Sequence, residues 1–302
     1  MKKVLLIITS LFGLALTINA SKFVNLTPMP KHITVAEGAY KLPESYSINA
    51  KHLPDSICIE AEKFVQTILK TTGCKARITS KKKADIEMSL DTNLPNEGYK
   101  LSVTKKKIQI SASTTSGFFY AFQTIKKIMP AHVMAGLNPE QAQAIIPTFQ
   151  TDKRPTIPCV EIYDEPRFWY RGFMLDCGRH FFTVDEIKHI LDGMAMYKMN
   201  YFHWHLTEDQ GWRFEVKKYP RLTSIGSVAS DCRMNDMEKG YYWLGKPYGP
   251  FFYTQEDCRE IVEYARNLHI EVIPEIDMPG HIMAALAAYP EFSCTPEGEH
   301  KV

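Results

Sequence analysis

The second half of the chain repeats one order of elements three times: a short apolar strand, a loop with polar residues, and an amphipathic helix. The strands are predicted at residues 169–176, 201–206 and 270–277. Helices between short apolar strands are typical of a parallel sheet, because neighbouring parallel strands need a long crossover connection. The pattern therefore predicts an α/β fold for this half of the chain.

The helix starts in this half carry local signals. Thr183 is followed three residues later by Glu186, and Thr254 by Asp257, which is the spacing of a capping box. Apolar residues at helical spacing follow each signal, so each helix is expected to bury one face. A third helix is predicted to begin near Gly280.

Polar side chains gather where the predicted strands end, namely Asp176, His205, Glu208 and Asp277. In a β/α barrel the C-terminal ends of the strands form the rim that carries the chemistry. Three strands cannot close a barrel of eight. From the pattern alone, residues 166–302 are therefore predicted to form a parallel α/β sheet.

The first half of the chain has a different order of helices and strands and is predicted to be a small α+β domain over residues 21–165. A helix is expected at 59–70, two strands at 99–103 and 107–112, and a further helix ending before Pro130. No catalytic cluster stands out in this half. The segment 138–144 is predicted to be a loop, and the proline-rich segment 151–168 is predicted to be a boundary or linker.

The first twenty residues differ from the rest. Lys2 and Lys3 precede a largely apolar segment without charged residues, and the stretch closes on the small residue Ala20. This is the pattern of a secretory signal peptide, too short and wrongly flanked for a membrane anchor. We therefore predict a signal peptide at residues 1–20, a secreted or periplasmic protein, and no membrane span.

Charge and cysteine content exclude several partners. Without Lys2 and Lys3 the 36 basic residues fall to 34, which equals the 34 acidic residues, so no nucleic-acid partner is expected. The seven cysteines are scattered and form no C-x-x-C pair, which favours neither a zinc knuckle nor a dense disulfide framework. The sequence predicts no cofactor and no metal.

Arg179 is the first candidate for ligand binding. It follows a strand end and is flanked by aromatic residues, and its planar guanidinium offers several donors for hydroxyls or a carboxylate. A surface arginine paired with Asp176 explains the same residues equally well.

The pair His203 and His205 shares one face of its strand, because side chains alternate along a strand. Two histidines in this arrangement could bind a metal with Glu208 or Asp209, as in amidohydrolases. They could equally be hydrogen-bonded core histidines, and no third nitrogen ligand is evident.

The stretch VIPEIDMPGH places Glu275 and Asp277 two residues apart and His281 after a Pro-Gly turn. A carboxylate and an imidazole close together can tune a neighbouring acid. Asp277 and His281 could instead cap the helix that is expected to begin near Gly280. Periodicity leaves both interpretations open.

Longer stretches resemble a known family. The sequences YRGFMLDCGRHFF, YKMNYFHWHLTEDQGWRFEVKKYPRL and EVIPEIDMPGHIMAALAAYPE are together similar to glycoside hydrolase family 20, the β-N-acetylhexosaminidases. The sequence EGYKLSVTKKKIQISASTTSGFFYAFQTI resembles the small α+β domain that precedes the barrel in that family. The resemblance covers residues 22–302. It implies that residues 166–302 form the N-terminal part of a (β/α)8 TIM barrel, an incomplete one.

The resemblance implies exo-hydrolysis of terminal β-linked N-acetylglucosamine or N-acetylgalactosamine, with retention, by substrate-assisted catalysis. It implies that Arg179 binds hydroxyls of the terminal sugar. It also implies that Glu208 and His281 form an acid–imidazole relay that contacts the general acid, and that Asp277 is a carboxylate beside that acid. The implied partner is a carbohydrate, a glycan that ends in an N-acetylhexosamine.

The family's general acid belongs to an Asp-Glu pair at the end of a fourth strand. The sequence offers no such strand before Val302, so the pair is expected after Val302 and no catalytic residue is assigned within these residues. The 302-residue chain by itself is therefore expected to be inactive. Two alternatives stay open: a metal-dependent amidohydrolase that uses His203 and His205, and a non-catalytic carbohydrate-binding fragment.

Overall fold

The computed structural model describes residues 26–147, 154–236, 238, 240–298 and 300. Tertiary contacts divide the chain into two compact units, Met1–Arg167 and Phe168–Val302, and each is described by itself. We predicted the boundary between residues 165 and 166, two positions before this division. The predicted signal peptide lies outside the described residues.

The first unit contains a seven-stranded mixed sheet in the order β1-β7-β5-β6-β4-β2-β3. Its strands are β1 (His32–Lys41), β2 (Ser45–Ile48), β3 (Lys75–Ile78), β4 (Ile86–Leu90), β5 (Tyr99–Val103), β6 (Ile108–Ala112) and β7 (Thr156–Asp164). The antiparallel pair β5 and β6 is the hairpin that the sequence predicts across its lysine turn. Burial alternates along β5 and β6, so that one face of these strands is turned to a core.

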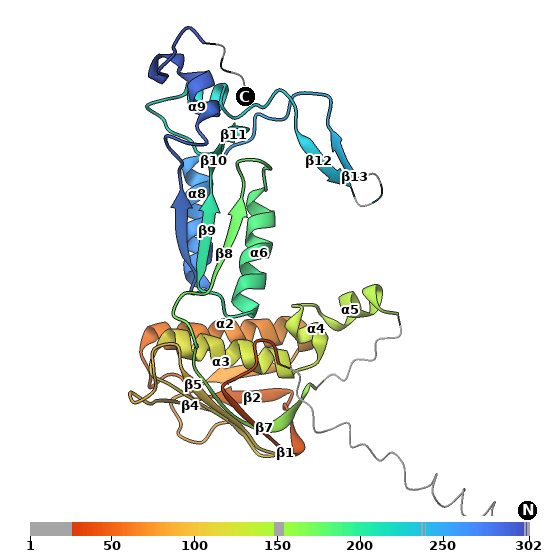
Figure 1. Ribbon diagram of the computed structural model, residues 1–302. Coiled ribbons are helices and arrows are strands. Elements are labelled where there is room, and N and C mark those ends of the chain that lie inside the picture. Colours follow the sequence, from red (N-terminus) through yellow and green to blue (C-terminus); the bar gives the residue numbers. More distant parts are fainter. Residues whose placement is uncertain (1–25, 148–153, 237, 239, 299, 301–302) are drawn as a thin grey trace, which may run out of the picture. The chain divides into compact units, whose positions relative to one another are not determined.

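Two long helices of this unit lie on one face of the sheet, α2 (Asp55–Thr72) and α3 (Thr115–Ile128) (Figure 1). Their apolar faces meet where the rings of Phe64 and Phe122 stack, with centroids 4.6 Å apart. Thr114 caps α3 by accepting a hydrogen bond from the Gly117 N–H. The predicted α+β layer is therefore present, with its core between the helices and the sheet.

Two predictions for this unit are wrong. Residues 138–144 were expected to be a loop, but most of them form α5 (Pro139–Ile145), which follows the short helix α4 (Ala131–Met134). The proline-rich segment 151–168 was expected to be a boundary or linker. The division between the two units does fall within it, but the linker interpretation is wrong, because the segment contains β7, which lies between β1 and β5 in the sheet.

The second unit is built on a three-stranded parallel sheet in the order β14-β9-β8. The strands are β8 (Gly172–Asp176), β9 (Tyr201–His205) and β14 (Glu271–Glu275), and the helices α6 (Val184–Met196) and α8 (Gln255–Asn267) connect them. The remaining elements are β10 (Thr207–Glu208), β11 (Gly211–Trp212), α7 (Arg221–Ser224), β12 (Arg233–Asp236), β13 (Gly240–Trp243), α9 (Met283–Ala288) and the 3-10 helix η2 (Pro290–Phe292). This confirms the predicted strand-and-helix alternation.

The helices α6 and α8 start where the sequence predicts. In each case the capping threonine accepts from the third helical N–H and the side chain at that position accepts from the threonine N–H. Both helices cover one face of the sheet, which buries Phe202 and Trp204 of β9 (Figure 1). The opposite face carries the alternating side chains of the strands, including Met174 and Ile273, which are largely exposed.

All seven cysteines are free thiols. Among the residues that the structure places, no helix has both the length and the apolar character that crossing a membrane requires.

Candidate functional site

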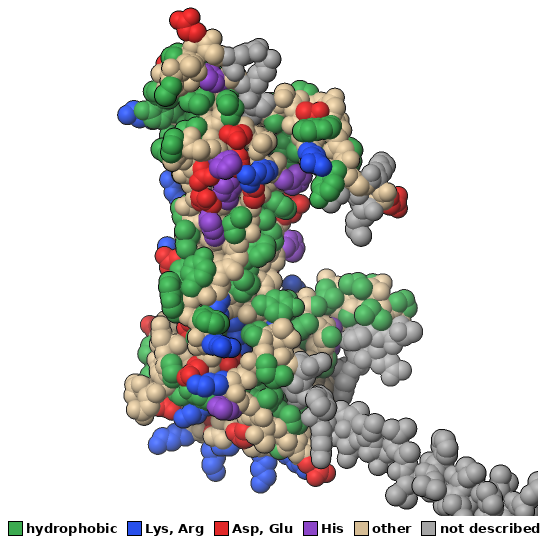
Figure 2. All heavy atoms as spheres, in the orientation of Figure 1, with side chains coloured by type: hydrophobic (Ala, Val, Ile, Leu, Met, Phe, Trp, Pro, Cys, Tyr) green, Lys and Arg blue, Asp and Glu red, His purple; other side chains and the backbone are tan. Residues whose placement is uncertain are grey.

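The C-terminal ends of the three parallel strands bring polar side chains into one row. The register sets Asp176 of β8 beside His205 of β9, and His205 beside Glu275 of β14. Figure 2 shows histidine, acidic and basic side chains gathered over these strand ends. This is the edge at which ligands bind in parallel α/β sheets.

Glu208 is the centre of the site, and its side chain is only 1% exposed. Its carboxylate accepts hydrogen bonds from the guanidinium of Arg179, from the backbone N–H of Asp209 at 2.6 Å, and from His281 Nδ1 at 3.0 Å. Buried carboxylates require such partners, because an unpaired charge is costly in a protein interior. The structure thus brings together Arg179, Glu208 and His281, which the sequence resemblance had grouped.

Arg179 bridges two carboxylates. Its guanidinium donates to Asp176 as well as to Glu208, and its backbone N–H donates to Asp176 Oδ1 at 3.0 Å. Hydrogen bonding to Asp176 raises the pKa of Arg179, so the charge is permanent. The pairing with Asp176 that we considered as an alternative is therefore present together with the contact to Glu208, and half of the side chain is still exposed to a ligand.

Tight backbone geometry holds Arg179 and Glu208 against each other. A Cβ atom on Gly178 would lie 2.6 Å from the Cβ of Glu208, so only glycine allows this approach. On the other side of Glu208, His281 has a positive φ of 51°, a conformation that is uncommon for residues other than glycine. It turns the imidazole toward Glu208.

His281 and Asp277 do not cap the helix that follows them. This helix, α9, begins at Met283 with Ile282 at its N-cap and no side-chain cap, and the N–H of Met283 donates to Asp209 instead. The helix-capping alternative for Asp277 and His281 is therefore wrong.

His203 and His205 share one carboxylate. His203 Nε2 lies 2.5 Å and His205 Nδ1 2.8 Å from the same oxygen of Glu275, Oε2. The hydrogen bond from His205 is the main cause of the lowered pKa of Glu275. The two histidines thus meet at Glu275, while Glu208 and Asp209, the expected further metal ligands, group with His281.

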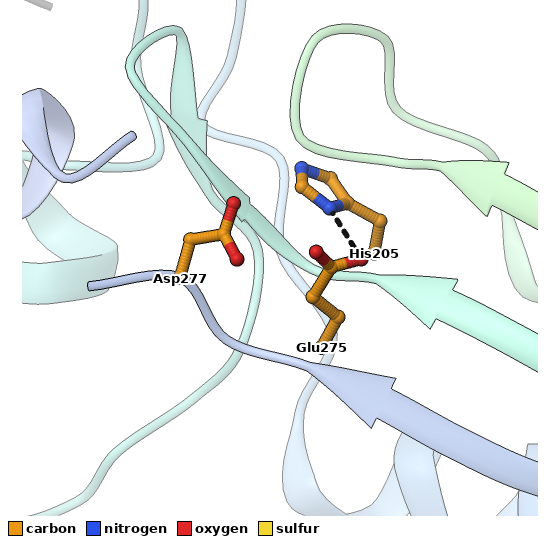
Figure 3. Close-up of side chains that lie close together, drawn as sticks. All are labelled: His205, Glu275 and Asp277. Atoms are coloured by element: carbon orange, nitrogen blue, oxygen red, sulfur yellow. Dashed lines mark ion pairs between the residues drawn. The ribbon is translucent and has the colours of Figure 1, made fainter. Parts of the chain in front are cut away.

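Asp277 lies just beyond the end of β14, where its backbone N–H donates to Thr207 Oγ1 at 2.9 Å. Its carboxylate is close to His205 and Glu275 (Figure 3). The structure therefore places Asp277 in the neighbouring cluster, and it groups Glu208 with His281 and Asp209.

Arg213 is a residue that the sequence analysis missed. Its side chain is fully buried and has no carboxylate partner among the residues that the structure describes. It donates to the backbone carbonyls of Cys177, Gly178, Gln210, Ser227 and Phe251. Burial lowers its pKa. By binding the carbonyl next to Arg179, Arg213 fixes the rim loops. Nothing in the sequence pattern separates it from the other arginines.

Comparison with known proteins agrees with this architecture. Residues 168–302 match the family model described as the catalytic domain of glycosyl hydrolase family 20, and residues 24–165 match domain 2 of the same family. A beta-hexosaminidase from Porphyromonas gingivalis is 40% identical over 288 residues, which cover 91% of this chain and 33% of that protein. The chain therefore spans about a third of the length of this relative.

Solved structures give the same result. The N-acetyl-beta-hexosaminidase of Streptomyces plicatus superposes with a TM-score of 0.75 at 30% identity, over 90% of this chain and 49% of that one. A Vibrio harveyi exo beta-N-acetylglucosaminidase in complex with N-acetylglucosamine gives 0.72 at 31% identity, over 88% and 38%. The two matching domains, the parallel strands and these likenesses together show that the chain belongs to glycosyl hydrolase family 20.

Proposed function

We propose that this chain forms the terminal-sugar-binding part of an exo-acting β-N-acetylhexosaminidase. The enzyme would release non-reducing terminal β-linked N-acetylglucosamine or N-acetylgalactosamine from a glycan. The observation that supports this proposal most is that Arg179 and His281 both contact the buried carboxylate of Glu208. Related proteins that bear the name beta-hexosaminidase support the substrate class.

The geometry supports a division of work in this site. Arg179 is held from two sides by carboxylates, so its remaining donors are pre-oriented for the hydroxyls of a sugar. Glu208 and His281 form a carboxylate–imidazole pair, in which a change of charge on one group alters the electrostatic potential at the other. Such a pair can stabilise both protonation states of a neighbouring general acid.

The proposal also includes a general acid and an aspartate that orients the acetamido group of the substrate. Among the placed residues, no Asp-Glu pair follows a strand of the parallel sheet. We place this pair after Val302, in agreement with relatives that are longer than the chain. The substrate's own 2-acetamido oxygen would then attack the anomeric carbon, and the product would keep its configuration.

The test uses protein expressed from the complete gene and a chromogenic N-acetyl-β-glucosaminide. We expect hydrolysis with retention, and the Arg179→Met variant should raise KM by roughly 10- to 100-fold, since hydrogen bonds to a charged group contribute about 1.5–3 kcal/mol. The matched control is Arg259→Met, because Arg259 is an exposed arginine on α8 whose ion pair within the described part of the chain is with Glu256 on its own helix.

The absence of hydrolysis on both the glucosaminide and the galactosaminide would overturn the proposed function. Full activity that is lost in chelator would favour the metal-dependent amidohydrolase. Sugar binding that persists without turnover in the complete gene product would favour a carbohydrate-binding protein.

We also propose that the protein is exported, with cleavage after Ala20. The support is the sequence of residues 1–20, a charged start followed by an apolar segment. N-terminal sequencing of protein from the periplasm or medium should give Ser21 as the first residue. An intact Met1 on the mature protein would contradict this.

A further inference from the structure

The strand register places one imidazole between two carboxylates. Asp176 of β8 and Glu275 of β14 both lie directly beside His205, on the two strands that flank β9. His205 Nδ1 lies 2.8 Å from Glu275 Oε2, a contact drawn in Figure 3, and His205 Nε2 lies 4.0 Å from Asp176 Oδ1. We propose that His205 is a positioning residue for the terminal sugar, which acts by fixing Asp176 and thereby Arg179. The inference rests on the proposed function, because that function assigns Arg179 to sugar binding.

The Nε2 atom of His205 is buried and unused. The residue is only 6% exposed, and this nitrogen has no hydrogen-bond partner among the residues that the structure describes. A buried polar atom without a partner is unfavourable, because it has lost its contact with water and gained no other. The ring nitrogen therefore favours a closer contact with the carboxylate on its own side of the ring, that of Asp176.

A small rotation of Asp176 closes this gap. Hydrogen bonds between nitrogen and oxygen are about 2.7–3.2 Å long, so the carboxylate has to move by only about 1 Å. Its side chain is 23% exposed and is followed by the turn at residues 177–179, which leaves room for the rotation. The imidazole has less freedom, because it is buried and Glu275 holds its Nδ1 atom. His205 is therefore the fixed member of the contact and Asp176 the adjustable one.

Asp176 passes this constraint on to Arg179 in two ways. Its Oδ1 atom accepts from the backbone N–H of Arg179 at 3.0 Å, and its Oδ2 atom accepts from the guanidinium. The orientation of the carboxylate thus sets the orientation of the guanidinium, whose side chain is half exposed and keeps donors for a ligand. Because binding groups must be held closely in the productive geometry, fixing Asp176 favours sugar binding.

The contact would complete an alternating row of nitrogen bases and carboxylates across the three strand ends. Each carboxylate of the row lies between two bases, and every link except that between His205 and Asp176 is at most 3.0 Å long. The order is His203, Glu275, His205, Asp176, Arg179, Glu208 and His281. His205 is thus the residue through which the pair at Glu275 reaches the sugar-binding group.

The test uses protein expressed from the complete gene and two substitutions that separate the two ring nitrogens. The amide nitrogen of asparagine is bonded at the position of Nδ1, and that of glutamine lies one bond further out, at the position of Nε2. We expect His205→Asn to raise KM about tenfold and to change kcat less than about twofold, because uniform binding is lost. His205→Gln keeps a donor toward Asp176 and should keep KM within about threefold of the unsubstituted enzyme.

A double substitution tests whether His205 acts through Arg179. In the Arg179→Met background, His205→Asn should leave KM unchanged, because the effects of residues that act through one contact are not additive. His189→Gln is the control and should leave both constants unchanged, since His189 is an exposed histidine on α6 whose Nδ1 contacts the Asp185 carbonyl. Thermal unfolding verifies that each variant is folded at the assay temperature.

Three results would contradict this role: an unchanged KM in His205→Asn, a lower kcat at constant KM, or an additional loss in the Arg179→Met background. Each leaves the proposed function intact, whereas absence of hydrolysis by the unsubstituted enzyme would overturn the function and this role together. If His205→Asn does not fold, Glu275→Met replaces it, because Glu275 is partly exposed and holds the ring. This variant should show the same rise in KM, again only where Arg179 is present.

Discussion

Arg213 holds a buried positive charge, and no described residue places a carboxylate in contact with it. Its guanidinium is satisfied entirely by backbone carbonyls, which belong to four separate stretches of the rim. A planar fork with five N–H donors can serve this many acceptors, whereas a lysine ammonium has three. The loop that carries Arg179 is thus fixed by a residue that itself faces away from solvent.

Replacing Arg213 with methionine should therefore destabilise the second unit strongly. The substitution keeps most of the volume but leaves five backbone carbonyls without these donors, and we expect a loss of roughly 3–5 kcal/mol in the free energy of unfolding. Urea denaturation followed by tryptophan fluorescence measures the change. Arg259→Met on the exposed face of α8 should change it by less than about 0.5 kcal/mol. Equal effects of the two variants would show that the carbonyl contacts contribute little.

At the level of single residues, the sequence predicted contacts well where a motif was long. The grouping of Arg179 with Glu208 and His281 came from resemblance, because these residues follow three different strands of the parallel sheet and no periodicity links them. Strand parity predicted that His203 and His205 share a face, and they both reach Glu275. The alternation of side chains along a strand does not extend to Asp277, because β14 ends at Glu275.

At the level of elements, the helix starts were the most predictable features. Thr183 with Glu186 and Thr254 with Asp257 form complete capping boxes, in which each partner satisfies a backbone N–H of the other. This interaction is local in the sequence, so it needs no knowledge of the fold.

The Thr254→Ala substitution should destabilise the second unit by about 1 kcal/mol, because an N–H in the first turn of α8 loses its acceptor. Thr254→Ser keeps the hydroxyl and should have a much smaller effect. Thermal unfolding measured on both variants checks this expectation. If alanine and serine were equivalent, the cap would not contribute to stability.

The wrong predictions for elements have physical reasons. The segment 138–144 was assigned to a loop, although Asn138 and Gln141 form a capping box and Pro139 occupies the first helical position, where it needs no N–H donor. For β7, prolines suggested a linker. Pro158 is tolerated because it lies outside the part of β7 that pairs with β5 and opposite an irregularity of β1.

At the scale of the whole molecule, the two units differ in how completely they cover their sheets. The first unit places α2 and α3 over its sheet, with a continuous apolar core. In the second unit α6 and α8 cover one face, whereas the other face leaves Met174 52% and Ile273 38% exposed. An exposed apolar sheet face with open edge strands favours association.

We therefore expect the units to behave differently when they are separated. Residues 26–167 alone should unfold cooperatively on heating, since their core is self-contained. Residues 168–302 alone should bind a hydrophobic dye and associate at micromolar concentration. Scanning calorimetry and dye fluorescence provide the two measurements. If residues 168–302 alone unfolded cooperatively and bound no dye, this would contradict the argument from the exposed apolar face of their sheet.

The strand order of the first unit has a consequence during synthesis on the ribosome. Among the described strands β1 pairs with β7 alone, yet β7 follows it by roughly 115 residues along the chain. At a translation rate of about 5–20 residues per second, the nascent β1 stays without a partner for roughly 6–23 seconds. An emerging segment with free backbone groups for that long is a natural binding site for a ribosome-associated chaperone.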